Sequence, residues 1–287
     1  LTLASLLAAF NLNAIEIGPT GSGVDMSGFV DMAYAERGAA GSSAFSGQVE
    51  LNLNYTSGPV SAAVGLDFGE GAAYGGADNL EEAYITYDFG NGFSATMGRI
   101  LTYMGFEAFD APNMYQMTYA YDAFHAASLE GFSAASGFSD MNNSGPQDIY
   151  DAYDYGASID YGTDAFSVGL WSSLEEDAGY EVALAFTGIE NLTAKAIWSD
   201  FTDQGYEKST FWVSYQAGAL LLAAEVAERD EKTAGGIDID GVMLMANYAV
   251  SDVVGLTLRY SEEEISDAVT NTVGYDGSKF TISPSYM

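Results

Sequence analysis

Short segments in which apolar and polar residues alternate run through most of this chain. In residues 45–55, Val49, Leu51 and Leu53 are apolar and the positions between them are polar. Alternation with a period of two gives a β-strand one apolar and one polar face. Many of these segments are close to the ~9–11 residues with which a tilted strand crosses a bilayer. The pattern therefore predicts an antiparallel sheet long enough to span a membrane.

Helices are a poor alternative for the membrane-spanning parts. After residue 14, no apolar run approaches the ~20 residues that a transmembrane helix needs. The longest run, residues 217–227, is interrupted by Glu225. If this chain crosses a membrane, we expect it to do so with strands.

The charge balance narrows the class of protein. The chain has 41 acidic and 8 basic residues, a net charge of −33, yet 48% of its residues are apolar and 33 are glycines. A soluble chain this acidic is usually poor in apolar residues, whereas an outer-membrane β-barrel has an apolar outside and a polar inside. Eight scattered basic residues cannot neutralise a phosphate backbone, so nucleic acid is excluded as a partner. The absence of cysteine excludes disulfides and thiolate metal sites.

The alternation predicts one barrel domain over residues 15–287. Residues 1–14 have the apolar core and small-residue end of a secretory signal peptide; a short buried helix is the alternative. About fifteen strands are predicted, including a weak one at 128–139. Single-chain bacterial barrels have even strand numbers, so we expect about 16 strands in the parent protein, with the last one missing from this chain. The expected fold class is an all-β transmembrane antiparallel barrel.

A long aromatic and acidic segment interrupts the alternation at residues 102–127. It is too long for a hairpin turn and too apolar for a free surface loop. We expect it to fold into the barrel and form the narrowest point of the channel. The alternative is that residues 114–121 form another membrane strand.

Five short motifs resemble the β-barrel porins of Gram-negative outer membranes. They lie at residues 28–32, 82–90, 98–99, 105–108 and 282–286. The resemblance covers most of the chain after residue 14. It implies a location in the cell outer membrane of a Gram-negative bacterium and a water-filled pore for passive diffusion of small hydrophilic solutes. It does not imply a particular solute.

The polar faces of the predicted strands carry mainly acids. The predicted pore-lining residues are Asp31, Glu50, Asp67, Glu82, Asp88, Asp154, Asp160, Glu181, Lys195, Glu225 and Arg259. A channel wall of this sign attracts cations. The alternative is a non-conducting structural or adhesin-like barrel whose acidic surface loops bind ions.

The predicted constriction contains Arg99, Glu107, Asp110 and Asp122. Strand parity puts Arg99 on the lipid side, where an arginine at mid-membrane costs about 2–4 kcal/mol. Either it sits at the membrane interface, or a bulge at Gly98 turns it inward toward Glu107. The resemblance favours the inward orientation.

Other chemistry receives weaker support. Asp140, Asn142, Ser144 and Asp151 have the spacing of a calcium loop, but helical flanks are missing and the twelfth position is not Glu. An ordinary polar loop is the preferred interpretation, and no cofactor is expected.

An enzyme is also disfavoured, because the single histidine, His125, has Ser128 nearby but no persuasive third member of a triad. The expected partners are outer-membrane lipids and small hydrophilic solutes or cations. The oligomeric state stays open, with a trimer as one possibility.

Overall fold

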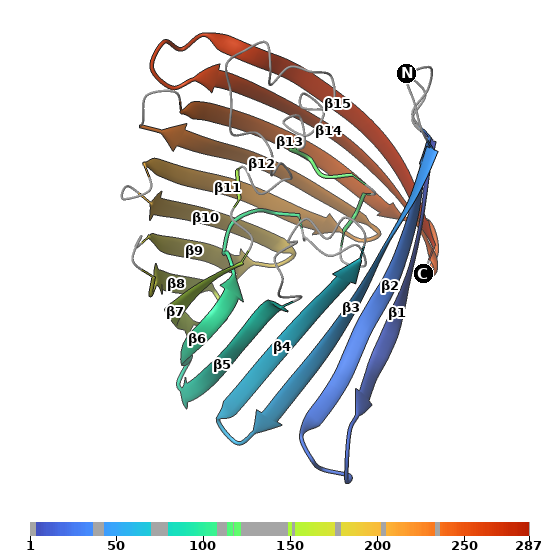
Figure 1. Ribbon diagram of the computed structural model, residues 1–287, viewed down its shortest axis with the longest axis vertical. Coiled ribbons are helices and arrows are strands. Elements are labelled where there is room, and N and C mark those ends of the chain that lie inside the picture. Colours follow the sequence, from blue (N-terminus) through green and yellow to red (C-terminus); the bar gives the residue numbers. More distant parts are fainter. Residues whose placement is uncertain are drawn as a thin grey trace.

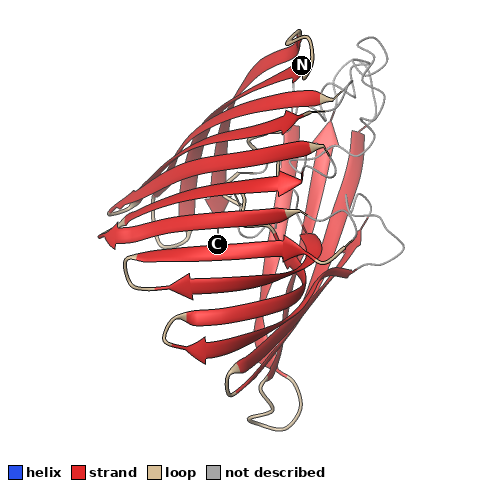
Figure 2. Ribbon diagram, turned by 90° about the vertical axis from the view of Figure 1, so that its left-hand side faces the viewer, coloured by secondary structure: helices blue, strands red, loops and turns tan. Residues whose placement is uncertain are grey.

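The computed structural model describes residues 4–36, 43–69, 80–107, 114–116, 118–121, 149–150, 153–175, 179–201, 205–232 and 236–286. They form one antiparallel sheet of fifteen strands, in which each strand pairs with its neighbours in sequence (Figure 1). Figure 2 shows that the described residues consist of strands and loops. In this part of the chain, no helix is long and apolar enough to cross a membrane.

The strands have the following bounds: β1 Ala4–Glu16, β2 Val24–Glu36, β3 Ser43–Ser57, β4 Val60–Gly69, β5 Leu80–Gly90, β6 Phe93–Leu101, β7 Tyr153–Gly162, β8 Phe166–Ser173, β9 Tyr180–Ile189, β10 Leu192–Phe201, β11 Tyr206–Ala217, β12 Leu220–Glu231, β13 Ile237–Ala249, β14 Val254–Asp267 and β15 Val273–Tyr286.

The connections differ between the two ends of the sheet. One end has short turns, such as the one between β5 and β6, where Asn91 and Gly92 both have positive φ (55° and 83°). Positive φ at both central positions matches the right-handed twist of the flanking strands, which explains why Asn-Gly stands there. The longest connection, residues 102–152, leaves the other end of β6. The sheet therefore has a short-turn end and a long-loop end.

β6 and β7 pair directly although 51 residues separate them in the sequence, from 102 to 152. Their register runs from Phe93 opposite Tyr161 to Leu101 opposite Tyr153. The predicted strand at 128–139 lies outside the described residues. The alternative that residues 114–121 form a wall strand is wrong, because their described residues contain no strand.

The first strand lies where the sequence analysis expected the end of a signal peptide. β1 pairs with β2 from Ala4 opposite Glu36 to Glu16 opposite Asp25, so these residues extend the sheet rather than precede it. Cleavage of residues 1–14 stays a prediction. In the described sheet β1 and β15 each have one neighbour, and alternating strand directions make these two edges run the same way. The sixteenth strand also stays a prediction.

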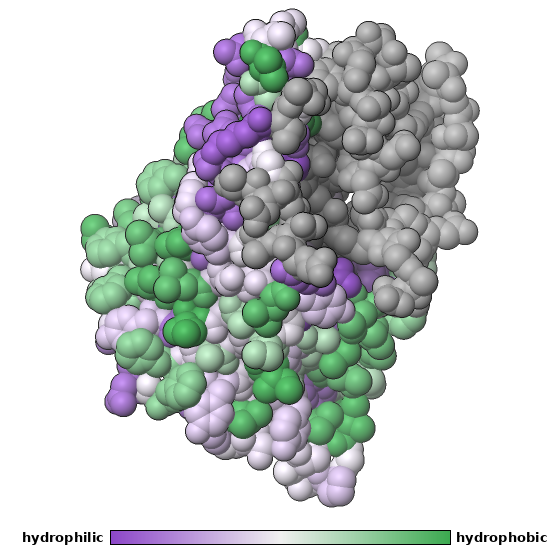
Figure 3. All heavy atoms as spheres, turned by 60° about the vertical axis from the view of Figure 1, so that its left-hand side comes forward, coloured by the Kyte–Doolittle hydropathy of each residue, from purple (hydrophilic) through white to green (hydrophobic). Residues whose placement is uncertain are grey.

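The predicted faces of the sheet are confirmed. On β3, Val49 is 44% exposed and the next residue, Glu50, is 6% exposed. Large apolar side chains such as Ile85 and Met97 are exposed on the convex side, and Figure 3 shows hydrophobic side chains spread over much of the face turned to the viewer. This is the face expected to contact lipid.

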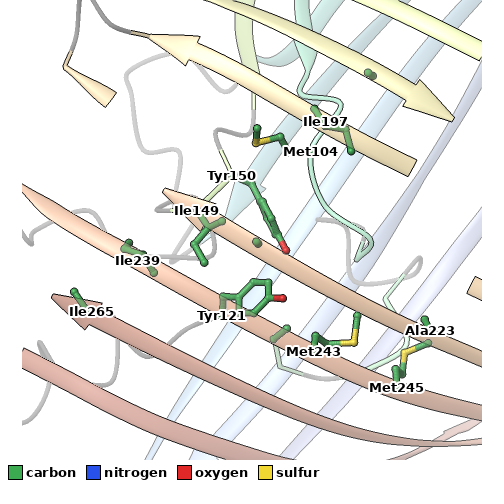
Figure 4. Close-up of a cluster of buried hydrophobic side chains, with 13 residues drawn as sticks. Met104, Tyr121, Ile149, Tyr150, Ile197, Ala223, Ile239, Met243, Met245 and Ile265 are labelled. Carbon is green, nitrogen blue, oxygen red and sulfur yellow. The ribbon is translucent and has the colours of Figure 1, made fainter. Parts of the chain in front are cut away.

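A buried apolar cluster lies on the concave side of the sheet (Figure 4). Ile239 and Met243 on β13 and Ile265 on β14 contribute to it from the wall. Tyr121 and Tyr150 contribute from the connection between β6 and β7. The main core therefore lies between the sheet and that connection.

Candidate functional site

The candidate site is the concave face together with the segment that crosses it. We call residues 102–107, 114–116 and 118–121 the inner segment. Figure 1 shows this part of the chain leaving β6 and running inside the curve of the sheet. Its hydrogen bonds to the wall reach β7, β9 and β10 near Tyr103, β12 at Phe106, and β14 and β15 near Tyr119.

The first attachment is to Glu181 on β9. One carboxylate oxygen accepts a hydrogen bond from the hydroxyl of Thr102 at 2.5 Å, and the other accepts one from the backbone N–H of Tyr103 at 2.9 Å. A buried carboxylate that accepts from two donors has its charge largely satisfied. Glu181 therefore fixes the point at which the chain turns inward.

Tyr103 is held from both sides. Its hydroxyl donates to Asp160 on β7 at 2.6 Å, and its carbonyl oxygen accepts from the ammonium of Lys195 on β10 at 2.9 Å. Gly169 on β8 makes room for the ring, because a Cβ there would lie 2.7 Å from Cζ of Tyr103. Residues of β7, β8 and β10 thus form the seat of one tyrosine.

The second attachment is to Glu225 on β12. Its carboxylate accepts from the backbone N–H of Phe106 at 3.1 Å and from the hydroxyl of Tyr150 at 2.9 Å. The ring of Phe106 also contacts Trp212 on β11 edge-on, with centroids 5.4 Å apart. Both ends of the long connection therefore meet at one buried carboxylate.

The third attachment is an ion pair. Arg259 on β14 donates to one carboxylate oxygen of Glu107, and the other oxygen accepts from the backbone N–H of Ala120 at 2.7 Å. The carbonyl oxygen of Tyr119 accepts from Arg259 at 2.6 Å and from Lys279 on β15 at 2.5 Å. The far end of the inner segment is thereby tied to the last two strands.

Burial keeps the tyrosines of this connection protonated. The pKa of Tyr103 is raised by burial and by its hydrogen bond to Asp160. The pKa of Tyr150 is raised well above the usual value of 10.0 by burial and by the negative charge of Glu225. Both hydroxyls therefore remain hydrogen-bond donors at neutral pH.

Eight of the eleven predicted pore-lining residues fall into two groups. Asp160, Glu181, Lys195, Glu225 and Arg259 lie on the concave face, where strand parity predicts them, but they hold the inner segment. The second group lies on β3–β5, where the predicted polar face carries Glu50, Asp67 and Glu82.

Three other acids have different positions. Asp88 accepts from the backbone N–H of Gly90 at 2.7 Å and caps the turn between β5 and β6. Asp154 accepts from the backbone N–H of Tyr155 at 2.7 Å near the start of β7. Asp31 stands in β2 opposite Gln48, and its side chain lies outside the described residues.

The predicted inward turn of Arg99 is wrong. The register of β6 continues through Gly98 and Arg99, which stand opposite Tyr84 and Ala83, so Arg99 stays on the convex face. Its guanidinium donates to the carbonyl oxygen of Leu80 at 2.6 Å. Arg99 lies two residues before Leu101, the last residue of β6. Gly98 forms no bulge and instead lets β5 and β6 approach closely. A Cβ at this position would lie 2.1 Å from the carbonyl oxygen of Ala83. This position fits the other interpretation, in which Arg99 lies near the membrane interface.

Some predicted residues cannot be placed. Asp110 and Asp122 of the predicted constriction lie outside the described residues, as do His125 and the calcium candidates Asp140, Asn142, Ser144 and Asp151. Within the described ranges, no group of three or more acidic or histidine side chains is arranged to hold a metal ion.

The sequence analysis missed two contributors to the site, Lys279 and Tyr150. The alternation of β15 could have placed Lys279 on the concave face, since it stands opposite Ser261. No local pattern marks Tyr150, which meets Glu225 only through the fold.

The fold is similar to solved porins along nearly the whole chain. OmpT, an outer membrane protein of Vibrio cholerae, matches with a TM-score of 0.59 and 15% identity over 92% of this chain and 82% of the other. Its trimer form matches with a TM-score of 0.54 and 15% identity over 99% and 84%. An anion-selective porin from Comamonas acidovorans matches with a TM-score of 0.56 and 15% identity over 98% and 84%. No family model and no curated protein matches the sequence. The described sheet therefore has the fold of the Gram-negative outer-membrane porins.

Proposed function

We propose that the chain is an outer-membrane porin, a water-filled channel for passive diffusion of small hydrophilic solutes. The observation that carries the proposal is the inner segment fastened across the concave face of a porin-type sheet. An apolar convex face suits lipid, and a polar concave face suits water. A segment held inside such a wall narrows the passage.

The proposed channel prefers cations. Five of the eight basic residues, Lys195, Lys208, Arg229, Arg259 and Lys279, stand on the concave face of β10–β15. Lys195, Arg259 and Lys279 bind the inner segment, and Arg229 pairs with Glu231 at 2.5 Å. The ammonium of Lys208 lies over the ring of Tyr206, 4.9 Å from its centroid. Because these cationic groups are engaged, the acids of β3–β5 dominate the charge that a passing solute meets.

Similarity of fold does not fix the sign of the selectivity. The Comamonas porin is described as anion-selective and matches this chain with only 15% identity. The net charge of −33 and the positions of the basic residues are properties of this chain, and they support a cation preference.

The constriction role of the inner segment is part of the same proposal. Segment 102–127 supplies Glu107, and Asp110 and Asp122 are the further acids assigned to the narrowest point. A trimer is proposed by analogy with the trimer form of the Vibrio OmpT structure.

The competing function is a non-conducting structural or adhesin-like barrel. Reconstitution of the folded chain in a planar bilayer separates the two. A porin gives stepwise conductance, and in a KCl gradient its reversal potential has the sign of a cation-preferring channel. The preference falls at high salt, because the screening length shrinks from about 10 Å at 0.1 M to about 3 Å at 1 M. Folded protein that inserts without conductance would support the scaffold.

A further inference from the structure

We propose that Gly169 on β8 and Gly241 on β13 set the width of the channel. Each glycine leaves room for one tyrosine ring of the inner segment, Tyr103 at Gly169 and Tyr121 at Gly241. These two contacts stop the segment at a fixed distance from the wall. Both glycines are positioning residues, because they act through the tyrosines. The inference rests on the proposed porin function and names the residues that limit the size of a passing solute.

Both glycines lie directly beneath a ring. A Cβ at Gly169 would lie 2.7 Å from Cζ and 2.9 Å from the hydroxyl oxygen of Tyr103. A Cβ at Gly241 would lie 2.5 Å from Cε1 and 2.9 Å from Cδ1 of Tyr121. The best separation of two non-bonded carbon atoms is about 3.5–4.0 Å. Neither position therefore has room for a methyl group while the ring stays in place.

The backbone gives no other reason for glycine at these two positions. Gly169 and Gly241 are not among the described glycines with positive φ, whereas Gly98 has a φ of 144°. A residue with a Cβ can adopt the backbone conformation of both without strain. The space beneath the ring is therefore what favours glycine.

The two glycines stand on one row that crosses the concave face from strand to strand. The register connects the members of this row in the order Gly169, Ala183, Ile197, Thr210, Ala227 and Gly241. The four residues between the glycines are at most 5% exposed. Three of them, Ala183, Ile197 and Ala227, belong to the same buried cluster as Met104 and Tyr121. The inner segment therefore rests on this row, with a tyrosine seated at each end.

Neither ring can simply turn aside. The hydroxyl of Tyr103 donates to Asp160 at 2.6 Å. Tyr121 is 2% exposed, and its ring meets that of Tyr150 edge-on with centroids 5.8 Å apart (Figure 4). Tyr150 is itself held by Glu225 at 2.9 Å. A methyl group at either glycine therefore displaces the backbone of the segment away from the wall.

The hydrogen bonds of the inner segment do not fix this distance by themselves. Glu181, Glu225 and Arg259 reach the segment through side chains with several rotatable bonds, which can follow a small shift. A rigid ring against a strand backbone has no such freedom. Figure 1 shows β3–β5 facing this part of the wall across the concave side, so a segment displaced from the wall narrows the space between them.

The test uses the full chain in planar bilayers and the variants Gly169→Ala, Gly241→Ala and Gly169→Ala/Gly241→Ala. Single-channel conductance is measured at 1 M KCl, where a screening length of about 3 Å suppresses the effect of fixed charges. Neutral poly(ethylene glycol)s of graded length measure the width, because a polymer that enters the passage lowers its conductance. Both single variants should conduct less than the original chain and exclude shorter polymers, and the double variant should do so more strongly. Unchanged or larger conductance in a folded double variant overturns the inference.

Gly162→Ala on β7 is the matched control. This glycine lies two residues after Asp160 on the same face, and its Cβ would lie 3.9 Å from Cβ of Ser167, an ordinary contact. Its conductance should equal that of the original chain. Gly241→Ala/Tyr121→Ala removes the ring that the new methyl group meets and should conduct as well as Tyr121→Ala alone. A folded protein of this kind that stays as restricted as Gly241→Ala counts against the inference.

Urea unfolding of the same proteins gives a readout that needs no conductance. Because Gly241 and Tyr121 are in contact, the shift of the unfolding midpoint in Gly241→Ala/Tyr121→Ala should be smaller than the sum of the two single shifts. Coupling of this kind in proteins that carry no current would support the contact and show that the porin function is what fails. Additive shifts overturn the contact and, with it, the inference.

Discussion

Arg259 on β14 and Glu107 in the inner segment form an ion pair across 152 positions of sequence, with side chains 0% and 5% exposed. Because both side chains are buried, water cannot replace either partner when the other is lost, as it could for a pair on the surface. Glu107 also accepts from the backbone N–H of Ala120, and Arg259 also donates to the carbonyl oxygen of Tyr119. The pair therefore joins three parts of the chain, and its loss leaves buried polar groups without partners.

Replacing Arg259 by methionine is expected to lower the free energy of unfolding by about 3–5 kcal/mol, because Glu107 would remain buried without its counter-charge. Urea unfolding of the folded protein in lipid vesicles measures the effect. The matched control is the double variant Arg259→Met/Glu107→Gln, which removes both charges and should recover part of the loss. If the double variant is as unstable as the sum of the two single variants, the two residues are not coupled.

Gly98 should not tolerate a side chain. Its φ is 144°, and a Cβ would lie 2.1 Å from the carbonyl oxygen of Ala83. Gly98→Ala is expected to destabilise the sheet by about 1–3 kcal/mol through backbone strain and separation of β5 from β6. Gly162→Ala on β7 is the control, since its nearest neighbour would be Cβ of Ser167 at 3.9 Å. Equal stability of the two variants would contradict the close approach of β5 and β6.

Alkaline pH should loosen the connection between β6 and β7, of which the inner segment is the first part. The pKa of Tyr150 is raised above 10.0 in the folded protein, so folding favours its protonated form. This contribution to stability is complete below pH about 10 and is lost as the pH rises from there toward the folded-state pKa. Hydrogen exchange of the Phe106 and Ala120 backbone N–H groups should therefore speed up above pH about 10.

The Tyr150→Phe variant has no ionisable group at this position, so it serves as the control for the pH effect. Its exchange rates should show a smaller rise over the same pH range, after correction for the intrinsic base catalysis of exchange. If the two proteins show the same rise, the ionisation of Tyr150 is not the cause.

The faces of the strands could be predicted from the sequence because alternation is a local property. Val49 and Glu50 fall on opposite faces whatever their partners are. The same parity placed Glu181, Glu225 and Arg259 on the concave side. Parity could not show that these side chains bind the chain itself, because their partners in the inner segment are distant in sequence.

The failed prediction for Arg99 has a comparable cause. The cost of an arginine in lipid depends on depth, and the sequence alone does not locate the end of the strand. A backbone carbonyl at Leu80 and the ring of Tyr155, 5.9 Å from the guanidinium carbon, provide its contacts on the convex face. β1 was missed because apolar residues followed by small ones are typical both of a signal peptide and of an edge strand.

Replacing residues 104–120 by a Gly-Ser linker should leave a folded sheet with larger conductance and weaker selectivity. β6 and β7 pair directly, so the wall does not depend on the segment for its hydrogen bonds. The replacement removes Met104, Phe106, Glu107 and Ala120, and with them the contacts to Trp212 and Arg259. Some stability will be lost, because burial of apolar surface contributes about 25 cal/mol per Å².

Single-channel conductance and the reversal potential in a KCl gradient measure the effect on transport. A Gly-Ser replacement of residues 250–253, an exposed turn at the other end of the sheet, is the matched control and should leave both unchanged. A folded barrel with unaltered conductance would show that the segment does not limit the passage. Failure of the variant to assemble, beside a control that folds, would show that the wall requires the segment, contrary to the pairing of β6 with β7.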